Sequence, residues 1–180
     1  MRNKSVKEIV MSGLFIAMGI LLPIVFHAFG MGSTFLPMHI PVLLAGFIVS
    51  LPFAIAAAVA TPVLSSLLTG MPPAFPVLLY MVFELAAYGA VANLLYRKLK
   101  LNAYIALIGS MIAGRIVCGA IVWILATFFM VQLPAPVLFI IGSITKSIPG
   151  IVIQLILIPP LILILAKNNL ITREGLTSES

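Results

Sequence analysis

Long apolar runs, separated by short segments rich in Pro, Gly and polar residues, fill most of the chain. The runs lie at 8–26, 39–50, 52–68, 76–96, 102–130 and 137–166. A helix needs about 20 mainly apolar residues to cross the hydrocarbon core of a bilayer, so the pattern predicts six transmembrane helices. The second run is short, and Pro52 separates it from the third with almost no loop. A bent or re-entrant pair stays open at this point.

The composition agrees with a membrane protein and excludes a soluble domain of this size. Hydrophobic residues make up 63% of the 180 positions and charged residues only 8%, against about 25% charged in ordinary globular proteins. Four acids and ten bases are too few for the polar coat of a soluble fold. We therefore expect an all-α integral membrane protein with a single transmembrane domain over 1–180, a basic tail at 1–7 and a cytoplasmic tail at 167–180.

Lys and Arg lie at the ends of the apolar runs, which is typical of topology determinants and not of a nucleic-acid-binding face. The basic residues cluster at 2–7, 97–100 and 167–173. With six helices, all three clusters fall on one side of the membrane. The segments on the other side contain no Lys or Arg: 27–38, 69–75 and 131–136. The positive-inside rule then predicts that both termini are cytoplasmic, and we expect a multi-pass protein of a bacterial plasma membrane.

Three charged residues fall inside the apolar runs, where charges are costly and usually functional. Glu84, Arg115 and Lys146 all lie in the outer half of the membrane or near its midplane, and His39 begins the second run in the same layer. These four groups from four helices predict a polar pocket that opens outward. Three alternatives stay open: Glu84 and Arg115 form a buried pair that only sets helix packing, Lys146 snorkels to the outer headgroups, and His39 is a hydrogen-bonded helix start.

The outer segments provide further candidates. The stretch 30–39 combines flexible glycines with the apolar anchors Phe35 and Met38, as expected of a loop that folds over a site. Ser65 supplies a hydroxyl beside the tight turn at 69–73, although serines in membrane helices often bond to their own backbone. We expect His27, further out in the loop, to be interfacial only.

Sequence motifs for catalysis or metal binding are absent. The chain contains no Walker A sequence, no H-E-x-x-H and no nucleophile elbow. The lone Cys118 excludes a disulfide within the chain and a C-x-x-C metal site. With one carboxylate inside the membrane, an enzyme is disfavoured, and we expect no cofactor or metal.

Gly13 and Ala17 lie four residues apart in the first run. Small residues at this spacing allow helices to approach closely. They serve either packing within this chain or docking of a partner helix.

With six predicted helices, a short basic N-terminus and small residues on the first helix, the chain resembles a known family, the substrate-binding S components of energy-coupling factor (ECF) vitamin importers. The most specific stretch is FLPMHIPVLLAG at 35–46, followed by LLTGMPP at 67–73 and FELAAYG at 83–89. These are similar to the group assigned to hydroxymethylpyrimidine or pyridoxine uptake. The resemblance implies that the chain captures a vitamin at the outer face, while a separate transmembrane coupling subunit and two cytoplasmic ATPases drive its release inward. It also implies docking through small residues on the first helix, typically AxxxA, where this chain has Gly13 and Ala17.

The expected substrate follows from charge and resemblance together. The candidate substrate-binding residues are His39, Glu84, Arg115, Lys146, Phe35, Met38, Ser65 and Tyr88. The three buried charges sum to +1, and His39 can add a proton, so the pocket favours an anion or a zwitterion. Pantothenate or nicotinate meets this condition, as does zwitterionic pyridoxine, whereas neutral hydroxymethylpyrimidine fits less well. A membrane scaffold without a ligand is the competing function; it predicts internally paired charges and no cavity.

Overall fold

The computed structural model describes residues 2–131, 133–168, 171–172 and 175–176. They form helices α1 (Arg2–Ala28), α2 (Gly32–Phe35), α3 (His39–Ile48), α4 (Leu51–Thr69), α5 (Val77–Asn93), α6 (Ala103–Phe128) and α7 (Pro136–Lys167). A π-helical turn, η1 (Leu94–Lys98), continues α5, and β1 (Ile171–Thr172) pairs antiparallel with β2 (Gly175–Leu176). The expected helical fold is confirmed, and each predicted apolar run falls on a helix.

Among the described residues, five helices are long and apolar enough to cross a membrane: Ser5–Ala28 within α1, α4, α5 with η1, α6 and α7. The exception is α3, whose ten residues extend about 15 Å, half of a 30 Å hydrocarbon core. Nine of its residues are buried, and it contacts α1, α4, α5 and α7. The prediction of six spanning helices is therefore refined to five such helices around a short, central α3.

The short α3 can lie at the centre because small residues bring its neighbours close. A Cβ added at Gly46 would lie 2.8 Å from the carbonyl oxygen of Gly89 on α5, and one at Gly89 would lie 3.3 Å from that of Ala54 on α4. Close backbone approach of this kind is how membrane helices gain packing contacts without a hydrophobic driving force. The small positions thus fix α3, α4 and α5 as the core of the bundle.

Local sequence sets where the helices begin and end. Pro52 lies in the first turn of α4, where a missing N–H costs little. Gly70 ends that helix with φ of 73°, a left-handed conformation that glycine adopts without strain. The Asn102 side chain accepts a hydrogen bond of 2.8 Å from the Ile105 N–H and caps the start of α6.

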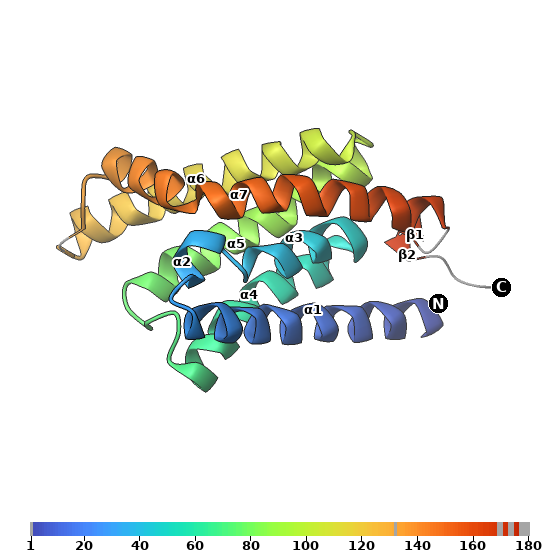
Figure 1. The fold of residues 1–180 in the computed structure, drawn as a ribbon, viewed down its shortest axis with the longest axis horizontal. Coiled ribbons are helices and arrows are strands. Elements are labelled where there is room, and N and C mark those ends of the chain that lie inside the picture. The colour runs from blue at the N-terminus through green and yellow to red at the C-terminus, as the bar shows by residue number, and fades with distance from the viewer. Residues whose placement is uncertain (1, 132, 169–170, 173–174, 177–180) are drawn as a thin grey trace.

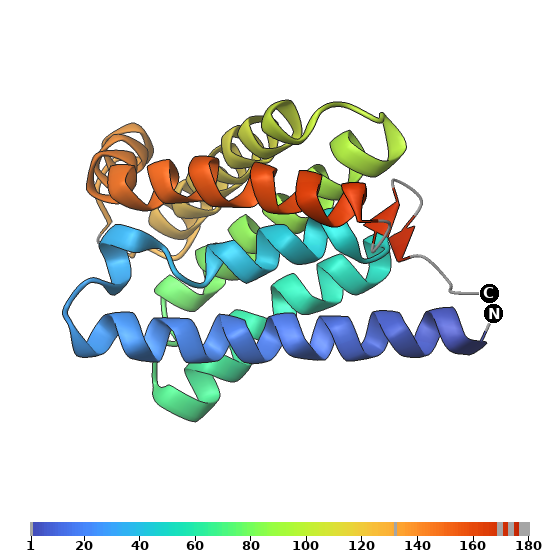
Figure 2. The ribbon, with the colours of Figure 1, turned by 45° about the vertical axis from the view of Figure 1, so that its right-hand side comes forward.

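The start of α1 and the end of α7 lie at the same end of the bundle, as Figures 1 and 2 both show. There β2 contacts α1 and β1 contacts α7. The opposite end carries α2 and the connections from α4 to α5 and from α6 to α7 (Figure 1). The described chain therefore runs along the bundle an even number of times between the start of α1 and the end of α7.

Candidate ligand-binding site

A cavity of about 290 Å³ lies at the end of the bundle that carries α2. Its walls come from α1, the segment 32–39, the α4–α5 connection, α5, α6 and α7. Five of the eight candidate substrate-binding residues line it: Met38, His39, Glu84, Arg115 and Lys146. We call this space the outer cavity.

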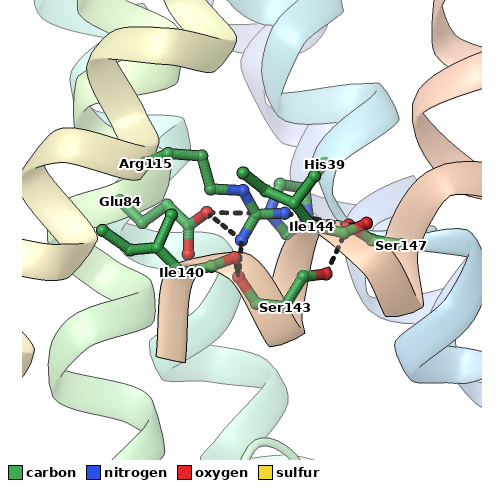
Figure 3. A network of polar contacts seen from close by, with 7 residues as sticks. All are labelled: His39, Glu84, Arg115, Ile140, Ser143, Ile144 and Ser147. Carbon is green, nitrogen blue, oxygen red and sulfur yellow. Dashed lines mark hydrogen bonds and ion pairs between the residues drawn. The ribbon is translucent and has the colours of Figure 1, made fainter. Parts of the chain in front are cut away.

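The floor of the outer cavity holds an ion pair between α5 and α6. Arg115 Nη1 lies 2.9 Å from Glu84 Oε1, and the two side chains are only 12% and 5% exposed. Figure 3 shows how α7 completes the arrangement: Arg115 donates hydrogen bonds to Ser143 Oγ at 3.3 Å and to Ser147 Oγ at 3.2 Å. Both serines in turn donate to carbonyls of their own helix. The guanidinium therefore joins three helices and has little freedom to move.

His39 lies beside this pair at the start of α3, as its sequence position predicted. The residue is 3% exposed, and Nε2 lies 3.9 Å from Glu84 Oε1. Its ring meets the Tyr88 ring edge-on, with centroids 5.2 Å apart. Neither ring nitrogen has a hydrogen-bond partner within the described part of the chain. Leaving a buried polar group without a partner is costly, and this histidine lines the outer cavity beside the ion pair.

Lys146 lines the same cavity from α7, one residue before the buried Ser147. Unlike Arg115, the lysine is exposed. Among the described residues, no carboxylate lies within ion-pair distance of its amine. With Glu84 and Arg115 neutralising each other, Lys146 supplies the uncompensated positive charge of this layer.

The comparison with protein families decides the class of protein. The family model described as "ECF transporter, substrate-specific component" matches residues 7–162. The chain belongs to this family. No curated protein and no solved structure matches the chain significantly. The protein is therefore an S component, a substrate-binding subunit of an importer that works with a membrane coupling subunit and ATPases.

Three residues predicted for the substrate site of this S component do not line the outer cavity. Phe35 lies on α2 and packs against Phe26, with ring centroids 5.5 Å apart. Ser65 donates a hydrogen bond of 2.7 Å to the carbonyl of Met71, a residue of the cavity wall. Tyr88 lines a separate, deeper space. Phe35 and Ser65 thus hold the walls in place.

Sequence reasoning missed several residues of the outer cavity. Tyr80 precedes Glu84 by one turn, Cys118 follows Arg115 by three residues, and Ser143 precedes Lys146 by three. Residues three or four apart share one face of a helix, so this spacing from the three charges could have found them. Phe139 was missed as well; it packs edge-on against Tyr80, with centroids 5.3 Å apart.

The expectation for His27 was wrong in part. It lies in the last turn of α1 and not in a loop, and it lines the outer cavity although it is exposed. The apolar run ended the predicted helix at residue 26, but His27 and Ala28 keep the helical conformation. The helix accordingly continues to Ala28.

The two small residues of α1 face outward in this S component. Gly13 and Ala17 are both exposed, and a Cβ added at Gly13 would meet nothing within 4 Å. Gly19 differs, because a Cβ there would lie 2.4 Å from Thr61 Cγ2. Packing within the chain therefore explains Gly19 but not Gly13.

Proposed function

We propose that this S component captures a small, water-soluble vitamin in the outer cavity, at the outer face of a bacterial plasma membrane, for ATP-driven uptake. The observation that carries the proposal is a cavity that is lined by the Glu84–Arg115 pair and by His39, whose ring nitrogens have no hydrogen-bond partner among the described residues. The competing scaffold function expected paired charges and no cavity. Pairing is present, but the cavity and Lys146 beside it favour ligand binding.

The direction of capture rests on charge. The basic clusters at 2–7, 97–100 and 167–173 adjoin the start of α1, the end of η1 and the end of α7. In Figure 2 these elements end on the side opposite α2, and the outer cavity lies at the α2 end. The positive-inside rule assigns that end, and both termini, to the cytoplasm, so the cavity opens to the outside.

The charge of the site favours a monoanionic or zwitterionic vitamin. Pyridoxine can present its phenolate to Lys146 and its ring N–H to Glu84, and it agrees with the subgroup that the sequence resembles. A carboxylate vitamin such as pantothenate or nicotinate is the second candidate, because Lys146 lacks a carboxylate partner among the described residues. Neutral hydroxymethylpyrimidine has no negative group to pair with the Lys146 amine.

The work of uptake is divided between chains in this proposal. A transmembrane coupling subunit docks on α1 at Gly13 and Ala17, where the helix surface is open to close approach. Two cytoplasmic ATPases supply the energy. This agrees with the absence of a Walker A sequence from the chain.

Equilibrium binding of a vitamin panel to the purified full chain tests the proposal. We expect one monoanionic or zwitterionic vitamin to bind more tightly than about 1 µM. Lys146→Met should weaken this binding about tenfold or more, because a hydrogen bond to a charged group contributes about 1.5–3 kcal/mol. Lys167→Met removes the same charge at the cytoplasmic end of α7 and should bind like wild type. Absence of any binding would refute the proposal, as would equal effects of the two substitutions.

A further inference from the structure

Two aromatic side chains from different helices meet at the wall of the outer cavity. Tyr80 comes from α5 and Phe139 from α7, and both line the cavity. Their rings meet edge-on, with centroids 5.3 Å apart and an angle of 74° between the ring planes. Within the described bundle, α5 and α7 each pack against α6, so this contact connects two helices that share α6 as their neighbour. We call Tyr80 and Phe139 the aromatic pair.

The aromatic pair lies further out than the polar groups of the cavity. Both α5 and α7 begin at the end of the bundle that carries α2 and run inward from there (Figure 1). On α5, Tyr80 precedes Glu84 by four residues, which is about 6 Å along a helix. On α7, Phe139 precedes Ser143 by four residues and Lys146 by seven, so all three share one face. A ligand whose charged group binds Lys146 therefore has its body close to the two rings.

The rings of the aromatic pair keep part of their surface accessible. Both are half-buried, whereas Glu84, one turn deeper, is buried. Two methionines from other segments line the same cavity: Met38, which precedes α3, and Met71 in the connection from α4 to α5. Thioether groups make favourable contacts with aromatic rings. At this level the cavity therefore offers rings and thioethers, which favour a flat aromatic ligand over a saturated chain.

We infer that the aromatic pair determines which ligand the outer cavity binds, and that this ligand is a compact aromatic heterocycle with one negatively charged substituent. This inference rests on the proposed function and narrows its substrate class. The substituent binds Lys146, and the ring lies against the aromatic pair in an offset-stacked or edge-on arrangement, the geometries that aromatic rings prefer. The cavity is near the lower limit of the sizes usual for ligand pockets, about 300 Å³, which favours a small ring system. Pyridoxine and nicotinate meet these conditions, whereas pantothenate is an aliphatic chain.

An aromatic belt at the membrane–water interface is the competing explanation of the aromatic pair. Such belts gather near helix ends, and Tyr80 and Phe139 both lie in the first turns of their helices. Another edge-on pair, Trp123 and Phe128 on α6, fits a belt better: both side chains are exposed, and neither lines the outer cavity. The aromatic pair differs in both respects, which favours a role in ligand binding.

The test compares planar and aliphatic probes by equilibrium binding to the purified full chain. Nicotinate and pantothenate carry the same charge, but only nicotinate is an aromatic ring; pyridoxine is the zwitterionic ring. We expect wild type to bind nicotinate or pyridoxine at least tenfold more tightly than pantothenate. Tyr80→Leu and Phe139→Leu should each weaken the preferred planar vitamin about tenfold, because an aliphatic side chain has no ring face or edge to offer, and should change pantothenate affinity less than twofold. Tyr80→Phe keeps the ring and should bind like wild type.

Phe128→Leu is the matched control, because it removes a ring of the other edge-on pair, outside the outer cavity; it should bind every probe like wild type. The inference is overturned if wild type prefers pantothenate, if both leucine variants weaken planar and aliphatic probes equally, or if they bind the planar vitamin as tightly as Phe128→Leu. Tyr80→Phe as weak as Tyr80→Leu also overturns it, since the hydroxyl and not the ring would then bind the ligand. Each of these results leaves the proposed function intact, because its own test depends on vitamin binding and on Lys146→Met.

Discussion

Arg115 on α6 and Glu84 on α5 form an ion pair of 2.9 Å at the floor of the outer cavity. Both side chains are nearly buried, so their mutual attraction is offset by the cost of removing them from water. Ser143 and Ser147 on α7 reduce that cost by accepting hydrogen bonds from the guanidinium. The pair therefore has two roles at once: it joins three helices, and it forms a polar part of the cavity wall.

Removing one partner of this pair should destabilise the fold. Glu84→Leu leaves Arg115 charged and unpaired, at a cost of about 3 kcal/mol or more, and should lower the midpoint of thermal unfolding in detergent by several degrees. Glu84→Leu combined with Arg115→Leu should recover much of the loss, because two apolar residues replace the pair without leaving a charge behind. Both variants should bind ligand poorly. A single variant as stable as wild type would show that the pair does not hold the helices together.

The sequence predicted that Glu84, Arg115 and Lys146 lie at similar depths in the membrane. It did not determine which of these charges pair with one another. Helical rise and run length fix how deep Glu84 and Arg115 lie, whereas their separation depends on helix rotation and side-chain torsions. The start of α3 at His39 was predicted correctly because the second apolar run begins at that residue. The left-handed backbone of Leu36 was not predicted. Nor was the burial of Gln154, whose Nε2 has no hydrogen-bond partner among the described residues. Their conformation and environment come from contacts between segments far apart in the chain.

The lengths and positions of the helices were likewise predicted only where they depend on the local sequence pattern. The short second run correctly indicated an unusual α3, because Pro52 separates it from the third run with almost no loop. That α3 is the buried centre of the bundle depends on Gly46 and Gly89 meeting across helices, which no single-helix pattern contains. The end of α1 was placed too early, since His27 looks polar by composition yet continues the helix.

Asn93 should be more important for stability than its position near a helix end suggests. Its Nδ2 donates to the carbonyls of Gly46 at 2.9 Å and Val49 at 2.7 Å, and Arg97 also donates to Val49. Carbonyls at the end of a helix have no partner within it, so Asn93→Ala should cost about 2 kcal/mol. Asn102→Ala, which removes the cap of α6, should cost about 1 kcal/mol. Thermal unfolding of the two variants compares them directly, and an Asn93→Ala effect no larger than that of Asn102→Ala would contradict the prediction.

Gly150 should determine how closely α2 lies over the cavity. A Cβ at this position would lie 2.5 Å from the Phe35 carbonyl oxygen, so Gly150→Ala must push α2 away from α7. Overpacking of this kind destabilises a protein by about 1–3 kcal/mol. Because α2 borders the cavity, its displacement should lower ligand affinity about tenfold. Gly142→Ala on the same helix is the control, because a Cβ there meets nothing within 4 Å. Unchanged ligand affinity in Gly150→Ala would mean that α2 does not contribute to the site.

Docking of the coupling subunit should depend on Gly13. Because a Cβ at Gly13 meets nothing within 4 Å, Gly13→Leu should leave folding and vitamin binding intact. It should reduce copurification with the coupling subunit about tenfold or more, since a bulky side chain prevents close helix approach at the centre of an interface. Gly142→Leu places the same side chain on another open helix surface and should assemble normally. Gly19→Leu should instead damage the fold, because Thr61 occupies the space. Normal assembly of Gly13→Leu would move the docking surface elsewhere, and loss of vitamin binding together with assembly would assign Gly13 to the fold.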